Sequence, residues 1–271
     1  MPHRVTVLPQ QRNIQAQSGE TLLSVLRRAD LAPDAPCGGS GTCGKCKVLL
    51  DGREVLSCQT PVNRDMTVTL PPEPDALILT DGIESELPAE GGLCLAIDIG
   101  TTTVAAYLLE NGRVLATESR KNPQASFGAD VVSRLQYTRK GHGAELTAAI
   151  KACVTDMTAA LLRKSGKTQP DTVCVGGNPA MQQLFLGMTT ENLTKPPFSP
   201  LLTKAEVLEG GQVLPLWAGA ELLMVPNISG YIGADTVACI LATGMEHEDK
   251  LTLLVDIGPT ARWCWETKTD L

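Results

Sequence analysis

The sequence predicts an α+β protein with a small first domain in residues 1–71 and a larger α/β domain from residue 93 onwards. Three observations support this prediction. Four cysteines and several glycines gather between residues 37 and 58, a stretch rich in proline, glycine and acidic residues follows, and strand and helix patterns alternate after it. A length of 271 residues agrees with about two domains, and we expect residues 72–92 to be the linker.

The first domain begins with two short strands, RVTVLP and NIQAQ, followed by a helix in TLLSVLRRADL. Ser18 to Thr21 offers capping residues for this helix, and leucines recur along it at helical spacing. Further on, KVLL and REVLS flank Asp51-Gly52, a pattern typical of a hairpin with a two-residue turn, and MTVTLPP is a last strand. This order of strands, helix, loop and hairpin is that of a compact β-grasp domain.

The four cysteines of this domain are spaced C-x5-C-x2-C-x11-C and are Cys37, Cys43, Cys46 and Cys58. Four Cys thiolates are the ligands that a 2Fe-2S cluster requires, and the spacing resembles that of β-grasp ferredoxins. The glycines in CGGSGTCGKC let the backbone fold tightly around such a cluster. The alternatives are a zinc site, which favours two CxxC pairs where this chain has one, and a disulfide framework. We therefore predict a 2Fe-2S cluster and single-electron transfer.

Composition excludes several classes of protein. A net charge of −7 without a basic run argues against nucleic-acid binding. No apolar stretch reaches the roughly 18 residues of a membrane span, and the N-terminus has no signal peptide, so we expect a cytoplasmic protein. Nine cysteines without secretion agree with a reducing compartment. Four of those outside the motif lie in apolar runs, and we expect them to be small buried hydrophobes: Cys94, Cys153, Cys174 and Cys239.

The second strong pattern is LCLAIDIGTTTVAAYLLENGRVLATES, which predicts a strand, a tight turn and two further strands. Proteins of the actin, Hsp70 and sugar-kinase superfamily hold nucleotide phosphates with such a hairpin. By that resemblance Gly100 lets the backbone approach a phosphate, and Thr101, Thr102 and Thr103 donate hydrogen bonds. Asp98 would be the catalytic residue, acting on Mg²⁺ through its water shell. The alternative is an ordinary buried hairpin, but a buried carboxylate in an apolar strand needs a partner.

Helix and strand patterns then alternate. We expect helices in ADVVSRLQYTR, ELTAAIKACVTDMTAALLRKSG, PAMQQLFLG and YIGADTVACILATGM, and strands in DTVCVGG, ELLMVPNISG and LTLLVDIG. The last strand repeats the Asp-x-Gly pattern, so Asp256 and Gly258 resemble a second phosphate site. Asp130 is either a polar residue of the nucleotide site or the cap of the helix after it, and we favour the cap. Asn227, Gly230 and Gly233 are either structural or site-lining.

The motifs in this order resemble the ferredoxin-fused ATPases of the actin, sugar-kinase and Hsp70 class that reductively activate corrinoid proteins. The resemblance rests on the cysteine loop, AIDIGTTTVAAYLL, FGADVVSRL, the GN-x2-M motif, PNISGYIGADTVA and LLVDIG. It implies that the chain takes an electron from a low-potential donor and passes it to the Co(II) corrinoid of a methyltransferase's corrinoid protein, with ATP and Mg²⁺ driving the step. The family tends to have threonine where this chain has Pro179 and Ala180, so hydroxyl groups have no role there.

The sequence departs from that family after Gly258. The family continues DIG with TNGE and a full second lobe, whereas this chain reads DIGPTARWCWETKTDL, without an apolar period. We hypothesise that one base was lost there and that residues 259–271 are out of frame, so that residues 93–250 form one ATPase lobe and residues 251–271 only the start of another. We then expect weak or absent ATPase activity. The alternatives are a simple 2Fe-2S electron carrier and a small-molecule kinase, which requires a complete second lobe.

Overall fold

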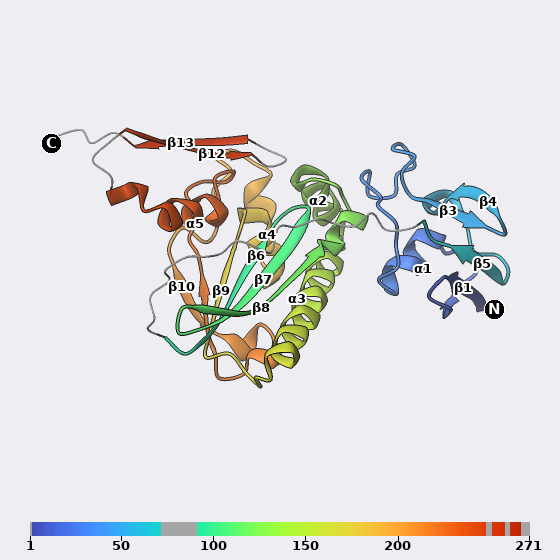
Figure 1. Ribbon diagram of the computed structural model, residues 1–271. Coiled ribbons are helices and arrows are strands. Elements are labelled where there is room, and N and C mark those ends of the chain that lie inside the picture. The colour runs from blue at the N-terminus through green and yellow to red at the C-terminus, as the bar shows by residue number, and fades with distance from the viewer. Residues whose placement is uncertain (1, 72–90, 248–250, 258–260, 267–271) are drawn as a thin grey trace. The chain divides into compact units, whose positions relative to one another are not determined.

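A computed structural model describes residues 2–71, 91–247, 251–257 and 261–266 of the chain (Figure 1). By their contacts the described residues form two compact units. The first unit joins the N-terminal residues to a later segment, Pro123–Ala149, and the second holds the residues before and after that segment. This division is not linear in the sequence, because Pro123–Ala149 clusters with the N-terminal residues.

The first unit contains a five-stranded mixed sheet in the order β2-β1-β5-β3-β4. β1 and β5 are parallel, and the other neighbouring strands are antiparallel. The strands are β1 (His3–Leu8), β2 (Arg12–Ala16), β3 (Lys47–Leu50), β4 (Arg53–Leu56) and β5 (Met66–Thr69). The β-grasp order expected from the sequence is therefore present, with the short 3-10 helix η1 (Ser57–Gln59) between β4 and β5.

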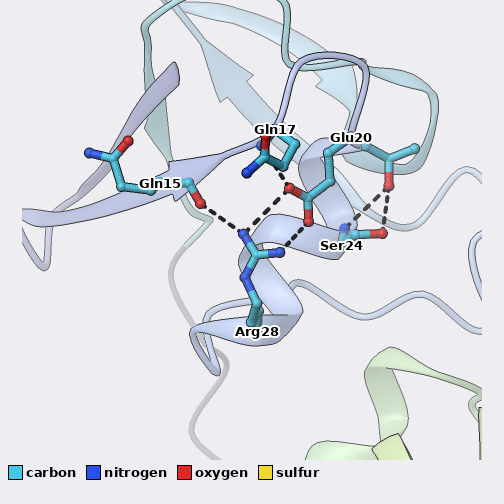
Figure 2. A network of polar contacts seen from close by, with 6 residues as sticks. Gln15, Gln17, Glu20, Ser24 and Arg28 are labelled. Carbon is cyan, nitrogen blue, oxygen red and sulfur yellow. Dashed lines mark hydrogen bonds and ion pairs between the residues drawn. The ribbon is translucent and has the colours of Figure 1, made fainter. Parts of the chain in front are cut away.

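Helix α1 (Leu22–Arg28) packs on this sheet and is fixed at both ends. Thr21 is its N-cap, since the Thr21 hydroxyl accepts a hydrogen bond from the Ser24 amide over 3.3 Å. Figure 2 shows that Arg28, in the last turn, pairs with Glu20 and donates to the Gln15 carbonyl oxygen over 2.8 Å. The core beneath is aliphatic: Val5, Val7, Leu22, Val25, Leu26, Val48, Val62 and Val68. Burial of these side chains is the main stabilising contribution of the small domain.

The later segment of the first unit is organised around one buried arginine. It holds η2 (Pro123–Ser126), α2 (Val131–Tyr137), the π-helical turn η3 (Thr138–His142) and the first residues of α3 (Gly143–Ser165). Arg134 is fully buried, and its Nε donates to the Gly128 carbonyl oxygen over 2.9 Å and its Nη1 to Gln124 Oε1 over 3.3 Å. Burial lowers the pKa of Arg134 to about 10, against the opposing effect of Asp130.

The second unit is built on a six-stranded sheet in the order β10-β11-β9-β6-β7-β8. β11, β9 and β6 are parallel, and the other neighbours are antiparallel. The strands are β6 (Leu93–Ile99), β7 (Thr103–Glu110), β8 (Arg113–Lys121), β9 (Thr172–Gly177), β10 (Glu206–Glu209) and β11 (Glu221–Met224). Helix α3 is tied to β8 by ion pairs between Lys164 and Glu118 and between Arg120 and Asp156. The mixed α/β architecture expected from the alternating patterns is thus present.

The second unit also contains α4 (Pro179–Leu186), α5 (Ala234–Thr243) and four 3-10 turns, η4 (Glu191–Leu193), η5 (Gly210–Gln212), η6 (Pro215–Trp217) and η7 (Met245–His247). β12 (Thr252–Ile257) pairs with β13 (Ala261–Glu266) in a separate two-stranded sheet. The sequence has no apolar period after Gly258, and the backbone of β13 nevertheless pairs with β12 along six residues. The reading frame of that stretch stays a hypothesis.

The cysteines outside the motif are less buried than we expected. Cys153 on α3 is buried, but Cys94, Cys174 and Cys239 are only partly covered. Cys94 and Cys174 lie at positions of β6 and β9 that alternate with the fully buried ones, which explains their partial exposure. None of the helices in the described part of the chain combines the length and the apolar character needed to cross a membrane.

Candidate cluster and phosphate sites

The cysteine loop of the first unit gathers four thiols from three places in the chain. Cys37 and Cys43 lie on the loop itself, Cys46 directly precedes β3, and Cys58 lies in η1. The β3–β4 hairpin carries Cys58 back to Cys46, and Ser57 fixes the return. The Ser57 amide and hydroxyl both donate to the Cys46 carbonyl oxygen, over 2.9 and 3.0 Å. Cys46 and Cys58 are buried, whereas Cys37 and Cys43 are partly exposed.

The four thiols lie within one neighbourhood, because Cys37, Cys43 and Cys46 all act on the pKa of Cys58. Burial alone raises the pKa of Cys37, but hydrogen bonds from Ser40, Cys43 and Gly39 outweigh it and lower that pKa to about 5. Burial, the bond to Cys46 and the neighbouring sulfurs raise the pKa of Cys58 to about 11.

This arrangement fits a two-iron cluster. Within the described ranges, no three His, Cys, Asp or Glu side chains converge closely enough to hold a single metal ion, as a mononuclear zinc site would require. Four neighbouring thiols match the four cysteine ligands that two irons share. The loop backbone also needs glycine: Gly39 has a φ of +97°, and a Cβ there would lie 3.1 Å from Leu23 Cδ2. Gly41 has a φ of +83° and leaves no room beside the Gln59 side chain.

The candidate phosphate hairpin lies at the carboxyl end of β6 in the second unit. Leu95, Ile97 and Ile99 alternate toward the core, so Asp98 points to the opposite face and is exposed. The sequence indicated a buried carboxylate here, and that expectation was wrong because the strand alternates at this end. An exposed carboxylate beside a turn is still placed to hold hydrated Mg²⁺, which keeps several waters of its shell.

The conformation of the turn after β6 depends on Gly100 in the turn itself and on Asn122, the residue after β8. A Cβ on Gly100 would lie 2.7 Å from the Thr103 carbonyl oxygen, so only glycine allows the chain to turn this tightly. Asn122, directly after β8, is fully buried. Its Nδ2 donates to the Gly100 carbonyl oxygen over 2.7 Å, and its backbone amide donates to the Thr102 carbonyl oxygen over 2.8 Å. These bonds fix the turn in one conformation, which preorganises its amides and hydroxyls.

A second asparagine links this turn to the neighbouring helix. Asn178 is the N-cap of α4, and its Oδ1 accepts from the Met181 amide over 3.1 Å. Its Nδ2 donates to Thr101 Oγ1 over 3.0 Å. The register of β6 and β9 places Ile99 beside Gly177, so the start of α4 lies next to the turn. A helix N-terminus is favourable for a phosphate because its amides and dipole point at the anion.

The N-terminus of α5 reaches the same place. A Cβ on Gly233, the N-cap of α5, would lie 2.6 Å from Asn178 Cα, so the two helix starts are in direct contact there. Asn227 is buried and bonds to both of these helices. Its Oδ1 accepts from the Ala234 amide over 3.1 Å, and its Nδ2 donates to Gln182 Oε1 over 2.6 Å. Asn227 and Gly233 therefore have structural roles, a point that the sequence had left open.

The other residues that the sequence analysis named lie at the following positions. Asp130 is the N-cap of α2 in a capping box with Ser133, as we favoured over a site role. Asp256 lies on β12, where only the backbone is described, and Gly258 lies outside the described residues. Pro179 and Ala180 are buried at the start of α4, where they supply no hydroxyl.

Sequence reasoning missed the two asparagines. Asn178 precedes a proline at the first helical position, which is a recognisable N-cap signal. Asn122 also precedes a proline, but its role in the turn could not be found from the sequence, because its partners are backbone carbonyls of residues far away along the chain.

Comparison with known proteins matches two stretches of the chain. Residues 5–67 match the 2Fe-2S iron-sulfur cluster binding domain, and residues 93–248 match the RACo middle region. The corrinoid activation enzyme RamQ of Eubacterium limosum is 31% identical over 182 residues, 65% of this chain and 30% of that protein. One of the subunits of the Na⁺-translocating NADH-quinone reductase of Pseudoalteromonas atlantica is 32% identical over 80 residues, 22% of this chain and 20% of that protein.

One solved structure has a similar fold over nearly the whole chain. It is the reductive activator for corrinoid, iron-sulfur protein, with a TM-score of 0.62 and 22% identity, covering 98% of this chain and 62% of that one. This chain thus spans less than two thirds of either activator. Because the RACo middle region matches more than half of the chain and follows a 2Fe-2S domain, the chain belongs to the RACo middle region family, in a form with an N-terminal 2Fe-2S iron-sulfur cluster binding domain.

Proposed function

We propose that this chain is a reductive activator, which transfers one electron to the Co(II) corrinoid of a corrinoid protein in a methyltransferase system and couples this step to ATP and Mg²⁺. The observation that supports the proposal is that one chain contains both a loop with four thiols and, in the RACo middle region, a candidate phosphate turn that Asn122 holds in place. The relatives that share parts of this arrangement are described as corrinoid activators. We place the protein in the cytoplasm, where thiols stay reduced.

The first unit provides the electron-transfer function. Cys37, Cys43, Cys46 and Cys58 would hold the 2Fe-2S cluster, which when bound supplies a one-electron redox couple. Cys46 and Cys58 are buried while Cys37 and Cys43 are partly exposed, so the loop side is where electrons enter and leave. Reduction of Co(II) to Co(I) consumes one electron, which an external low-potential donor must replace in each cycle.

The second unit provides the nucleotide function. Thr101 and the amides of its turn donate toward a phosphate, the start of α4 adds its dipole, and Asp98 orients the water shell of Mg²⁺. Thr102 and Thr103 complete the turn. Electron donation to Co(II) is uphill, so a nucleotide assists only by binding one state of the partner complex more tightly than the other. Asp256 and Gly258 remain the proposed second phosphate site.

A second candidate function is a 2Fe-2S electron carrier without ATPase activity. The similarity of the N-terminal residues to part of an NADH-quinone reductase favours a ferredoxin module that serves general electron transfer. The two functions differ in one measurable respect. A carrier reduces its acceptor equally well with and without nucleotide, whereas an activator requires it.

The test uses the chain with its cluster, Ti(III) citrate as electron donor and a corrinoid protein in the Co(II) state. Formation of Co(I) is followed by visible absorbance with and without ATP and Mg²⁺. Co(I) that forms only with nucleotide supports the activator, and a variant with Asp98→Asn should then lose this dependence. Equal Co(I) formation under both conditions would favour the carrier. No Co(I) under either condition, with the cluster fully reduced, would overturn both proposals for this acceptor.

A further inference from the structure

The segment Pro123–Ala149 contacts the cysteine loop and α1 of the first unit, and Arg27 donates two of the hydrogen bonds to this segment. Arg27 lies in the last turn of α1, and its Nε donates to the Ser126 carbonyl oxygen over 3.0 Å. Its Nη2 donates to the same oxygen. The guanidinium carbon lies 4.7 Å from the centre of the Phe127 ring and 5.5 Å from that of Tyr137, within the range of cation–π attraction.

The loop backbone meets the same segment. A Cβ on Gly38, the residue after Cys37, would lie 3.1 Å from the Phe127 carbonyl oxygen and 3.7 Å from Tyr137 Cδ2. A Cβ on Gly39 would lie 3.9 Å from Arg27 Nη1. The guanidinium is therefore beside the loop backbone at the residues that follow the first cluster ligand. A larger residue at Gly38 would separate the loop from the segment.

The aromatic side of this contact is itself held in place. Tyr137 and Phe127 have ring centres 5.4 Å apart, and Tyr137 stacks on His142 at 4.7 Å and 25°. The Tyr137 hydroxyl donates to Glu145 over 2.9 Å, and the same carboxylate lies 2.9 Å from His142 Nδ1. Two rings and a carboxylate thus fix Tyr137, so that Arg27 meets a rigid surface.

The charge of Arg27 bears on the cluster ligands. Burial lowers the pKa of Arg27, while Tyr137, Glu145, Cys46 and Cys37 raise it, and a guanidinium stays protonated at neutral pH. A fixed positive charge stabilises the form of a neighbouring group that carries more negative charge, and the reduced cluster carries one more than the oxidised cluster. Such a charge raises the reduction potential.

We propose that Arg27 is a positioning residue that fastens the 2Fe-2S domain to the segment Pro123–Ala149 and raises the reduction potential of the cluster. The proposal rests on the cluster and not on the corrinoid or the nucleotide.

The test compares three variants of the full chain with its cluster: R27Q, R27K and the matched control R28Q. Arg28 is on the same helix but pairs with Glu20 and Gln15 (Figure 2). Two properties are measured on each protein. One is the reduction potential, by titration followed by EPR, and the other is amide hydrogen exchange of the peptides that contain Gly38 and residues 126–137.

We expect R27Q to lower the reduction potential, so that the ratio of oxidised to reduced cluster at a fixed poise rises by at least about threefold, where tenfold corresponds to 59 mV for one electron. R27Q should also speed exchange in both peptides. R27K keeps the charge but not the planar fork that bonds Ser126 and stacks on the rings, so it should keep the potential and still speed exchange. R28Q should change neither property.

Three results would overturn the proposal. The first is an R27Q protein whose reduction potential or amide exchange is unchanged. The second is an R28Q protein in which both properties change as they do in R27Q. The third applies if R27Q does not retain its cluster, and it is an R27K protein whose amide exchange is unchanged. No corrinoid protein or nucleotide enters these measurements, so their failure is distinct from failure of the proposed function.

Discussion

The side-chain amide of Asn122 donates a hydrogen bond to the carbonyl oxygen of Gly100 over 2.7 Å, at the turn that we propose binds phosphate. The Asn122 backbone amide donates to Thr102 in the same turn. A residue at the end of β8 thus determines the conformation of the connection between β6 and β7. These two bonds satisfy the carbonyl oxygens of Gly100 and Thr102 within the protein.

Replacing Asn122 with alanine should destabilise the second unit. Asn122→Ala leaves the Gly100 carbonyl without this buried donor, at a cost of about 1–3 kcal/mol. The free energy of unfolding can be measured with denaturant, using the fluorescence of Trp217, which is buried in the same unit. Asn111→Gly, at the exposed β7–β8 turn with a positive φ, is the control and should change the stability little. Equal stability of the Asn122 variant and the wild type would contradict this prediction.

Replacing Cys46 with serine should abolish the 2Fe-2S cluster. Cys46 is buried, and a serine hydroxyl stays protonated where a thiolate ligand is needed. The visible absorbance and the EPR signal of the reduced protein should both disappear. Cys239→Ser, a partly covered cysteine on α5, is the matched control and should keep the full signal. A cluster signal of wild-type size in the Cys46 variant would remove Cys46 from the ligand set.

Cys37 should be more reactive than Cys58 in the cluster-free protein in mild acid. Its pKa of about 5 leaves it largely as thiolate at pH 6, whereas Cys58, with a pKa of about 11, is protonated. Because the thiolate is the nucleophile, iodoacetamide should modify Cys37 well before Cys58. The reactivity should be present above pH 5 and lost as the pH falls through this value. Peptide mass spectrometry at several pH values measures the order of modification, and equal rates at pH 6 would refute the prediction.

Asp130 should matter for stability and not for nucleotide binding. The Asp130 side chain accepts from the Ser133 amide over 2.7 Å, and the Ser133 hydroxyl accepts from the Asp130 amide over 3.2 Å. Loss of a helix cap costs about 1 kcal/mol, so Asp130→Ala should lower the free energy of unfolding by that amount. Asp130→Asn keeps a capping oxygen and should lose only a fraction of it. A nucleotide analogue titrated into both variants checks the second claim, since weaker binding in both would instead assign Asp130 to the site.

The sequence by itself determined the elements and the chemistry that depends on local spacing. Four cysteines around a two-residue hairpin turn are close in the chain, so their meeting follows from the turn at Asp51-Gly52. The strand alternation and the capping residues of α1 and α2 are equally local, which is why the expected elements are present with bounds that differ by a few residues.

Only the tertiary structure decided what depends on contacts between distant residues. The packing of Pro123–Ala149 against the cysteine loop joins Arg27 to Ser126 across 99 positions, and no local pattern encodes such a contact. The exposure of Asp98 depends on which face of β6 the core covers, and the roles of Asn122 and Asn178 depend on backbone carbonyls and hydroxyls supplied by other strands. The sequence specifies the type of each side chain, whereas the tertiary structure determines which distant residues it contacts.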